Sequence, residues 1–329
     1  MHAPRNSERS RRGRVPGLSG RAAEPLPPPA GKSPPAAPYA LTFLLGALAA
    51  ALACRAEQEP RFEPSVEPRR VVSLAPNLTE IVFALGAGRS LVGVSEYSDY
   101  PPEARAIPRV GGLEVSAEKV ASLRPDLVLA TREGNAPGPV SALSSAGFSV
   151  LVLPTGSLDA VLDSVRRTGD ALGRREQAER LAESLSARRA AVRALVGKGP
   201  RPKAILLVWP DPPQAAGGGT FLDDVLTEAG AENLVRNRPG WPVVSGEYLT
   251  AAPVEVLVLP ASAANRPAFE RALTSGGLSR GAARRARVVW VDESAITRPG
   301  PRVFDALEKL ARELHPETEH GTGNTEHAR

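Results

Sequence analysis

Cysteine and histidine are scarce in this 329-residue chain, and where they lie excludes most catalytic chemistry. The four histidines are His2, His315, His320 and His327, so residues 3–314 contain none. A zinc or other transition-metal site normally needs His or Cys ligands, and the only cysteine is Cys54. A catalytic metal centre is therefore not expected, and a His-based triad or general base is unavailable in this stretch.

Phosphate-binding glycine loops are also missing. The run Gly217-Gly218-Gly219 lacks the Gly-Lys-Ser/Thr that completes a Walker A loop. The glycines of Gly86-Ala-Gly88 close an expected helix instead of opening one, unlike a dinucleotide fingerprint. Adjacent acids such as Asp223-Asp224 point to different faces and are weak evidence for acid–base catalysis. The sequence thus favours binding over catalysis and predicts no enzyme and no cofactor.

The net charge of +5 belongs to the first part of the chain. Residues 1–53 contain seven basic and two acidic side chains, which leaves 34 basic and 34 acidic residues in the remainder. A body without net charge gives no support for nucleic-acid binding.

Residues 39–53 form an apolar run of 15 residues, shorter than the roughly 20 that a bilayer span requires. The run is typical of a signal peptide, and Ala51-Leu52-Ala53 supplies small residues at a cleavage site. Small residues followed by Cys54 resemble a bacterial lipobox, which implies a lipid anchor; plain cleavage beside an incidental cysteine is the alternative. We expect a signal peptide over 1–53, a lipidated Cys54 with a flexible tether over 54–68, and an extracytoplasmic location.

Short apolar strands alternate with amphipathic helices from residue 69 onward, which predicts an α/β fold with mainly parallel sheets covered on both faces. Asn77 is expected to cap the first helix. Expected strands are 71–76, 91–95, 126–130, 150–154, 204–209, 254–260 and 286–293, and expected helices are 78–88, 116–124, 139–147, 158–173, 174–196, 221–230 and 302–315.

The helix expected over 174–196 contains no proline and is long enough to join two lobes as a rigid strut. We predict an N-terminal α/β lobe over 69–156, a helical segment over 157–198, a C-terminal α/β lobe over 199–315 and a disordered tail over 316–329. The halves resemble each other: helix-Gly-Ala and then Glu-helix-Pro-strand occur in both, with Glu118 and Glu247 in matching positions. The repeat indicates two related lobes with a ligand cleft between them. The alternative is a chance match, because glycine and proline commonly end helices and strands in any α/β protein.

Three stretches carry a family resemblance. The stretch VVSLAPNLTEIVFALGAG, followed by LVGVSEYSDYPPEA and ASLRPDLVLA, resembles the periplasmic cobalamin-binding proteins of ABC importers, within the helical-backbone family of substrate-binding proteins. The first and third blocks are shared with relatives that carry haem or iron–siderophore complexes, whereas SEYSDYPP favours cobalamin. The resemblance covers about residues 69–314 and implies two lobes joined by one long helix, with limited hinge motion.

The resemblance also implies ligand contacts. Tyr97 matches a ring-contacting tyrosine, Trp241 a tryptophan that lines the cleft, and Arg298 an arginine that reaches ligand amides. A half-buried core tyrosine, a tryptophan packed under its loop and a solvent-exposed arginine are the respective alternatives. The family places an acid where this chain has Ser294, so Glu293, one position away, is a candidate substitute. A family tryptophan near Gly112 is missing, and Trp209 and Trp290 are expected in the core.

Glu118 and Glu247 match the glutamates that dock one lobe each onto arginine pockets of a dimeric permease in the family. Favourable interaction with a helix dipole is the alternative role. The resemblance thus implies a monomeric lipoprotein that captures cobalamin or a related corrinoid as transported ligand and delivers it to an ABC importer. Haem or a ferric siderophore is the alternative ligand. The third hypothesis is an extracytoplasmic hydrolase, which would need a base for its serine nucleophile, and the chain offers no internal histidine for that role.

Overall fold

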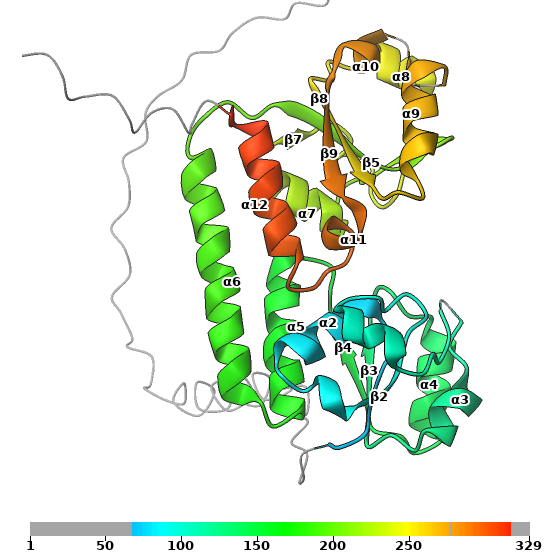
Figure 1. Ribbon diagram of the computed structural model, residues 1–329. Helices are drawn as coiled ribbons and strands as arrows, with labels where there is room; N and C mark the ends of the chain where they lie inside the picture. Colours follow the sequence, from blue (N-terminus) through cyan, green and yellow to red (C-terminus); the bar gives the residue numbers. More distant parts are fainter. Residues whose placement is uncertain (1–67, 113, 277, 280, 317–329) are drawn as a thin grey trace, which may run out of the picture. The chain divides into compact units, whose positions relative to one another are not determined.

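Two sheets organise the residues that the computed structural model describes, which are 68–316 except 113, 277 and 280 (Figure 1). The predicted signal peptide, the lipidation of Cys54, nearly all of the tether and nearly all of the C-terminal tail lie outside these residues. Within the described part, none of the helices has both the length and the apolar character that a membrane crossing requires.

The first sheet has the strand order β2-β1-β3-β4, and every pair is parallel. Its strands are β1 (Val71–Ser73), β2 (Leu91–Val94), β3 (Leu127–Thr131) and β4 (Val150–Leu153). The helices of this half are α2 (Pro76–Ala84), α3 (Ala117–Ser122) and α4 (Pro137–Ser145), with 3-10 turns η1 (Gly88–Ser90) and η2 (Pro102–Ala106). Because strand side chains alternate between faces, Leu127 and Leu129 enter one core cluster while Val128 enters another, so both faces are covered.

The second sheet has the order β6-β5-β8-β9, with β7 paired to β5, and only β6 runs antiparallel. Its strands are β5 (Lys203–Pro210), β6 (Pro213–Ala215), β7 (Glu232–Asn233), β8 (Val256–Ala261) and β9 (Arg287–Asp292). The helices of this half are α7 (Phe221–Glu228), α8 (Gly246–Ala251), α9 (Arg266–Thr274), α10 (Gly281–Arg285), α11 (Glu293–Ile296) and α12 (Val303–Leu314). The alternation recurs: Val256 and Val258 face one cluster, and Leu257 faces the other.

The two sheets share one parallel topology, since β2-β1-β3-β4 corresponds to β7-β5-β8-β9. Helices α2 and α7 also end alike, before Gly86 with φ of 73° and Gly230 with φ of 88°. This left-handed conformation suits glycine, which explains the repeated Gly-Ala signal. The prediction of two related lobes is confirmed; they are named below the N-terminal lobe (first sheet) and the C-terminal lobe (second sheet).

One long helix links the lobes, as predicted. Helix α5 (Leu158–Ala171) leads into α6 (Arg175–Val196), whose 22 residues extend about 33 Å. Helix α6 packs along α5 and then along α12 (Figure 1). Arg188 forms ion pairs with Asp305 and Glu308 of α12, and Arg189 pairs with Glu228 of α7. The N-terminal half of the strut therefore contacts the first lobe through α5, and its C-terminal half is fastened to the second.

A single apolar cluster runs from the first sheet through α5 and α6 into the second sheet. It contains Leu127 of β3, Val161 of α5, Leu185 of α6 and Val258 of β8. Moving the lobes apart would expose this shared apolar surface, which is unfavourable. The fold therefore favours small hinge motions over wide opening.

Two local predictions are wrong. Asn77 does not cap the first helix, because α2 begins at Pro76, two residues earlier than expected, and the buried Asn77 amide donates instead to the carbonyl oxygen of Pro299 at 3.1 Å. Trp209 is not in the core, because it lies near the end of β5, is 56% exposed and donates its indole N–H to the Asp211 carbonyl. Trp290 is partly buried, as expected, and packs edge-on against Phe269.

Candidate functional site

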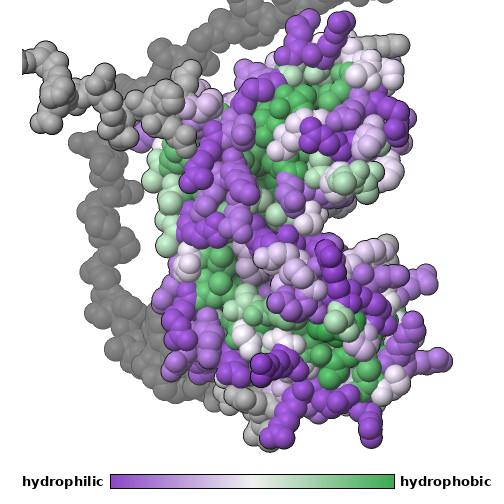
Figure 2. Space-filling model, in the orientation of Figure 1, coloured by the Kyte–Doolittle hydropathy of each residue, from purple (hydrophilic) through white to green (hydrophobic). Residues whose placement is uncertain are grey.

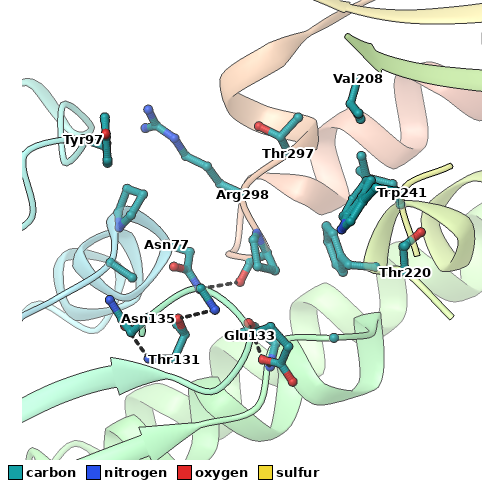
Figure 3. A pocket seen from close by; sticks show the side chains of 18 of the residues that line it. Asn77, Tyr97, Thr131, Glu133, Asn135, Val208, Thr220, Trp241, Thr297 and Arg298 are labelled. Carbon is teal, nitrogen blue, oxygen red and sulfur yellow. Dashed lines mark hydrogen bonds between the residues drawn. The ribbon is translucent and has the colours of Figure 1, made fainter. Parts of the chain in front are cut away.

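A cavity of about 660 Å³ is lined by residues of both lobes (Figure 3). The N-terminal lobe contributes the ends of β1 and β3 and the loops after β2 and β4, and the C-terminal lobe contributes segments around 219–222, 240–241 and 297–299. In Figure 2 the surface is hollowed between the portions that carry these two sets of elements. The volume lies within the range of small-molecule sites.

Tyr97 projects into this cavity from the loop after β2 and is 52% exposed (Figure 3). The loop is held in place by Arg109, which donates to the carbonyl oxygens of Ser95 at 3.1 Å and Ser98 at 2.6 Å. A Cβ at Gly112 would lie 3.1 Å from the Tyr97 ring, so the missing side chain leaves room for the aromatic plane. Tyr97 is thus an accessible aromatic surface and not a core tyrosine.

Trp241 lines the same cavity from the C-terminal lobe and is 48% exposed. Its segment is fixed by backbone hydrogen bonds from Gly217 to Gly240 at 2.9 Å and from Gly218 to Arg238 at 3.0 Å. The glycine run that resembled an incomplete phosphate loop therefore has a different role: it allows two backbones to approach closely. The indole is not packed under its loop.

Arg298 lines the cavity where the chain leaves α11, and its side chain is 16% exposed. Its guanidinium contacts Asp99 at 2.5 Å and Glu80 at 3.6 Å, both of which belong to the N-terminal lobe. Partial burial raises the pKa of Asp99, but the hydrogen bond and charge of Arg298, together with a backbone hydrogen bond and the charge of Arg105, lower the pKa below its ordinary value. The positive charge of Arg298 is therefore largely neutralised by the protein itself.

Glu293 and Ser294 are not among the residues that line the cavity. The Ser294 hydroxyl donates to Asp292 at 3.0 Å and accepts from Arg302 at 3.1 Å. Glu293 lies in the first turn of α11, where its backbone carbonyl accepts from the Thr297 hydroxyl. Direct ligand contact by these two residues remains a prediction.

A polar floor on the N-terminal side was not predicted. It consists of Asn77, Thr131, Glu133, Asn135 and Thr155 (Figure 3, in which all but Thr155 are labelled). The Asn135 amide ties the end of β3 to the end of β1, because it donates to Leu74 and accepts from Thr131. Polar residues at the carboxyl ends of parallel strands are the signal that could have found this floor.

Metal ligands are not gathered anywhere in the described residues: no group of three or more His, Cys, Asp or Glu side chains could hold an ion there. The one described histidine, His315, is buried near the carbonyl oxygen of Ala229, and the cavity lining does not include it.

Glu118 and Glu247 begin two equivalent helices. Ser116 caps α3 and Ser245 caps α8, each accepting from the backbone N–H three residues later. Each glutamate follows its serine by two residues and is exposed. Because α3 and α8 correspond between the lobes, the two carboxylates occupy matching positions, as the sequence repeat indicated.

Two α/β lobes of one topology, braced by a helix and lining a shared aromatic and polar cavity, define a substrate-binding protein. The periplasmic binding protein family matches residues 71–277, and this chain belongs to that family. Members bind and carry their ligand, so the chain is not an enzyme and its ligand is cargo and not a cofactor. The hydrolase hypothesis is thereby set aside.

Named relatives give the closer context. The chain is 30% identical over 259 residues to the uncharacterized ABC transporter substrate-binding lipoprotein YvrC of Bacillus subtilis, covering 77% of this chain and 82% of the relative. The periplasmic haem-binding protein RhuT of Roseiflexus in apo form matches with a TM-score of 0.69 at 30% identity, over 76% of this chain and 99% of that one. The periplasmic vitamin B12-binding protein BtuF of Vibrio cholerae matches with a TM-score of 0.68 at 27% identity, over 77% and 99%.

Proposed function

We propose that this protein captures cobalamin or a related corrinoid in the cavity between its lobes and delivers it to the permease of an ABC importer. The observation that carries the proposal is that Tyr97 and Trp241, from different lobes, line one cavity. A corrin is a broad, largely apolar disc edged with amides. Two accessible aromatic faces supply contact area with little loss of side-chain entropy, and the polar floor offers hydrogen-bonding groups to the amides.

Haem is the second candidate, because the haem-binding RhuT is as similar in fold as BtuF. Tyr97 supplies a phenol that could serve as an axial ligand, whereas no histidine lines the cavity. An anionic siderophore fits less well. It would favour several inward arginines, and among the lining residues only Arg298 is basic, already paired with Asp99.

Delivery to the importer rests on the exposed pair Glu118 and Glu247, which we assign to docking on a two-fold permease. The similarity to YvrC, named a lipoprotein, supports lipidation of Cys54 and an anchored, extracytoplasmic location. The docking role of Glu118 and Glu247 and the lipidation of Cys54 do not depend on which ligand the cavity binds.

Titration of the purified protein with cyanocobalamin, haemin and a ferric siderophore tests the ligand assignment. The chain has three tryptophans, so a Trp209→Phe/Trp290→Phe variant leaves Trp241 as the only indole reporter. We expect cyanocobalamin to bind most tightly and to quench Trp241 fluorescence.

Calorimetry on single variants then tests the aromatic surfaces. Tyr97→Ala and Trp241→Ala should each weaken cyanocobalamin binding by about 1–3 kcal/mol, by analogy with base stacking. Trp209→Ala is the matched control, because Trp209 is also about half exposed but does not line the cavity. Tighter binding of haemin than of cyanocobalamin would overturn the corrinoid assignment.

A further inference from the structure

Only two charged side chains line the described cavity, Glu133 and Arg298. Arg298 is paired with Asp99 at 2.5 Å and lies 3.6 Å from Glu80, so little of its charge remains for a ligand. Glu133 has no cationic partner within ion-pair distance in the described part of the chain, which leaves its negative charge uncompensated. Glu133 is therefore the charged group of the N-terminal floor that remains available to a ligand.

Glu133 is held in a defined orientation on the loop after β3. Its Oε2 accepts from the Thr155 backbone N–H at 2.8 Å and from the Thr155 hydroxyl at 2.9 Å. Two hydrogen bonds hold Oε2 in place and leave the second oxygen, Oε1, for another donor. Fixed donors and acceptors of this kind give a site its selectivity.

The second carboxylate oxygen, Oε1, forms no hydrogen bond among the described residues. Glu133 is exposed and lines the cavity, so a ligand can reach this oxygen. Gly156 lies beside it, and a Cβ there would come within 3.3 Å of Oε1. The absence of a side chain at Gly156 keeps this oxygen open to the cavity. A buried ligand group next to Oε1 must therefore donate a hydrogen bond or accept repulsion.

We propose that Glu133 selects the charge on the edge of the ligand: Oε1 accepts an N–H from a peripheral ligand amide and repels a carboxylate in the same place. This role rests on the proposed function, because it supposes that a macrocycle occupies the cavity. Amide-edged corrinoids satisfy Oε1, whereas macrocycles with peripheral carboxylates place like charges together. The substrate class is thereby narrowed to fully amidated corrinoids.

Corrinoids that differ at one amide test this selection directly. Dissociation constants are measured by calorimetry for cyanocobalamin and for its derivatives in which one peripheral amide is hydrolysed to a carboxylate. For at least one derivative, the native protein should bind cyanocobalamin about tenfold more tightly, which corresponds to about 1.4 kcal/mol. In Glu133→Gln this preference should fall to near unity, mainly because the carboxylate derivative binds better.

Glu103→Gln is the matched control, since Glu103 is exposed in η2 of the same lobe and does not line the cavity; its preference should equal that of the native protein. Tight cyanocobalamin binding with the same preference in Glu133→Gln as in the native protein would overturn the role of Glu133 alone. Absence of cyanocobalamin binding in the native protein would overturn the proposed function, and this role with it.

Discussion

Glu80 of α2 and Arg302, which precedes α12, form a two-bonded ion pair across 222 residues of sequence, with contacts of 3.0 and 2.5 Å. The Glu80 side chain is 2% exposed, and the guanidinium of Arg302 also lies over the Tyr100 ring at 4.0 Å. Burial raises the pKa of Glu80, and the hydrogen bonds and charges of Arg302 and Arg298 offset only part of that rise. The pair connects the N-terminal lobe to the C-terminal lobe, and the cavity residue Arg298 lies 3.6 Å from Glu80.

Breaking this pair from one side should destabilise the protein strongly. Arg302→Met leaves a buried carboxylate with only Arg298 nearby, and we expect a loss of about 3–5 kcal/mol in the free energy of unfolding. Glu80→Met/Arg302→Met removes both charges and should recover much of that loss. Urea denaturation of the native protein and the two variants measures both values; a double variant no more stable than Arg302→Met would contradict the argument.

A second ion cluster fastens the strut to the C-terminal lobe and should make stability depend on acid pH. Partial burial raises the pKa of Glu228, but hydrogen bonds and charges from Arg193 and Arg189 lower it by more, so the pKa lies below 4.5. As pH falls, an unfolded chain takes up the proton first. The contribution of Glu228 is therefore present above about pH 4.5 and is lost as pH falls through the folded pKa.

Glu228→Gln should accordingly lower the Tm near pH 6 by about 2–8 °C, for a loss of about 1–2 kcal/mol. The difference from the native protein should shrink near pH 3, where the native carboxylate is protonated as well. Thermal unfolding followed by circular dichroism between these pH values measures the effect. Glu183→Gln, an exposed position on α6, is the control. An equal Tm difference at both ends of the range would show that the cluster does not titrate as argued.

The architecture was accessible from sequence because its signals are local. Strand alternation, the proline-free stretch that became α6 and the repeated Gly-Ala ends each depend on neighbouring residues. The family resemblance pointed to Tyr97, Trp241 and Arg298, and the structure gathers these three around one cavity.

What could not be predicted depends on contacts between distant segments. The Asn77 amide does not cap a helix and instead donates a hydrogen bond to the carbonyl of Pro299, 222 residues away. Glu133 becomes a cavity carboxylate only because Thr155, from the next loop, orients it. Trp209 has an apolar strand pattern around it, but β5 at that point has run beyond the parallel sheet and pairs only with β6. Neither periodicity nor composition contains this information.

The glycine run beside Trp241 gives a third prediction. A Cβ at Gly217 would clash with the carbonyl oxygen of Arg238 and lie 2.9 Å from that of Gly240, so Gly217→Ala must push away the segment that carries Trp241. We expect a loss of about 1–3 kcal/mol in stability and weaker cyanocobalamin binding. Gly138→Ala in α4, which meets no atom within 4 Å, should leave both unchanged or slightly raise stability. Unchanged binding in Gly217→Ala would mean that the position of Trp241 does not depend on this contact.

The matching glutamates at the starts of α3 and α8 give a prediction about transport alone. If Glu118 and Glu247 dock onto a two-fold permease through charge-assisted bonds, Glu118→Ala/Glu247→Ala should reduce uptake of labelled cyanocobalamin into cells by at least about tenfold, or about 1.4 kcal/mol of docking energy. Binding to the purified protein should stay within about twofold, because neither residue lines the cavity.

Helix stabilisation is the competing role for these carboxylates, and stability measurements separate the two. A first-turn acid contributes about 0.3–1 kcal/mol to its helix, so a purely structural role predicts a lower Tm with uptake largely retained. Docking predicts the reverse outcome, in which the Tm is retained and uptake is lost. Each single variant should then show intermediate uptake, because it loses one of two equivalent contacts with the permease. Glu176→Ala/Glu183→Ala on α6 removes the same charge from exposed positions and should leave uptake intact. Equal loss of uptake in this control would indicate a dependence on overall charge in place of a docking contact at α3 and α8.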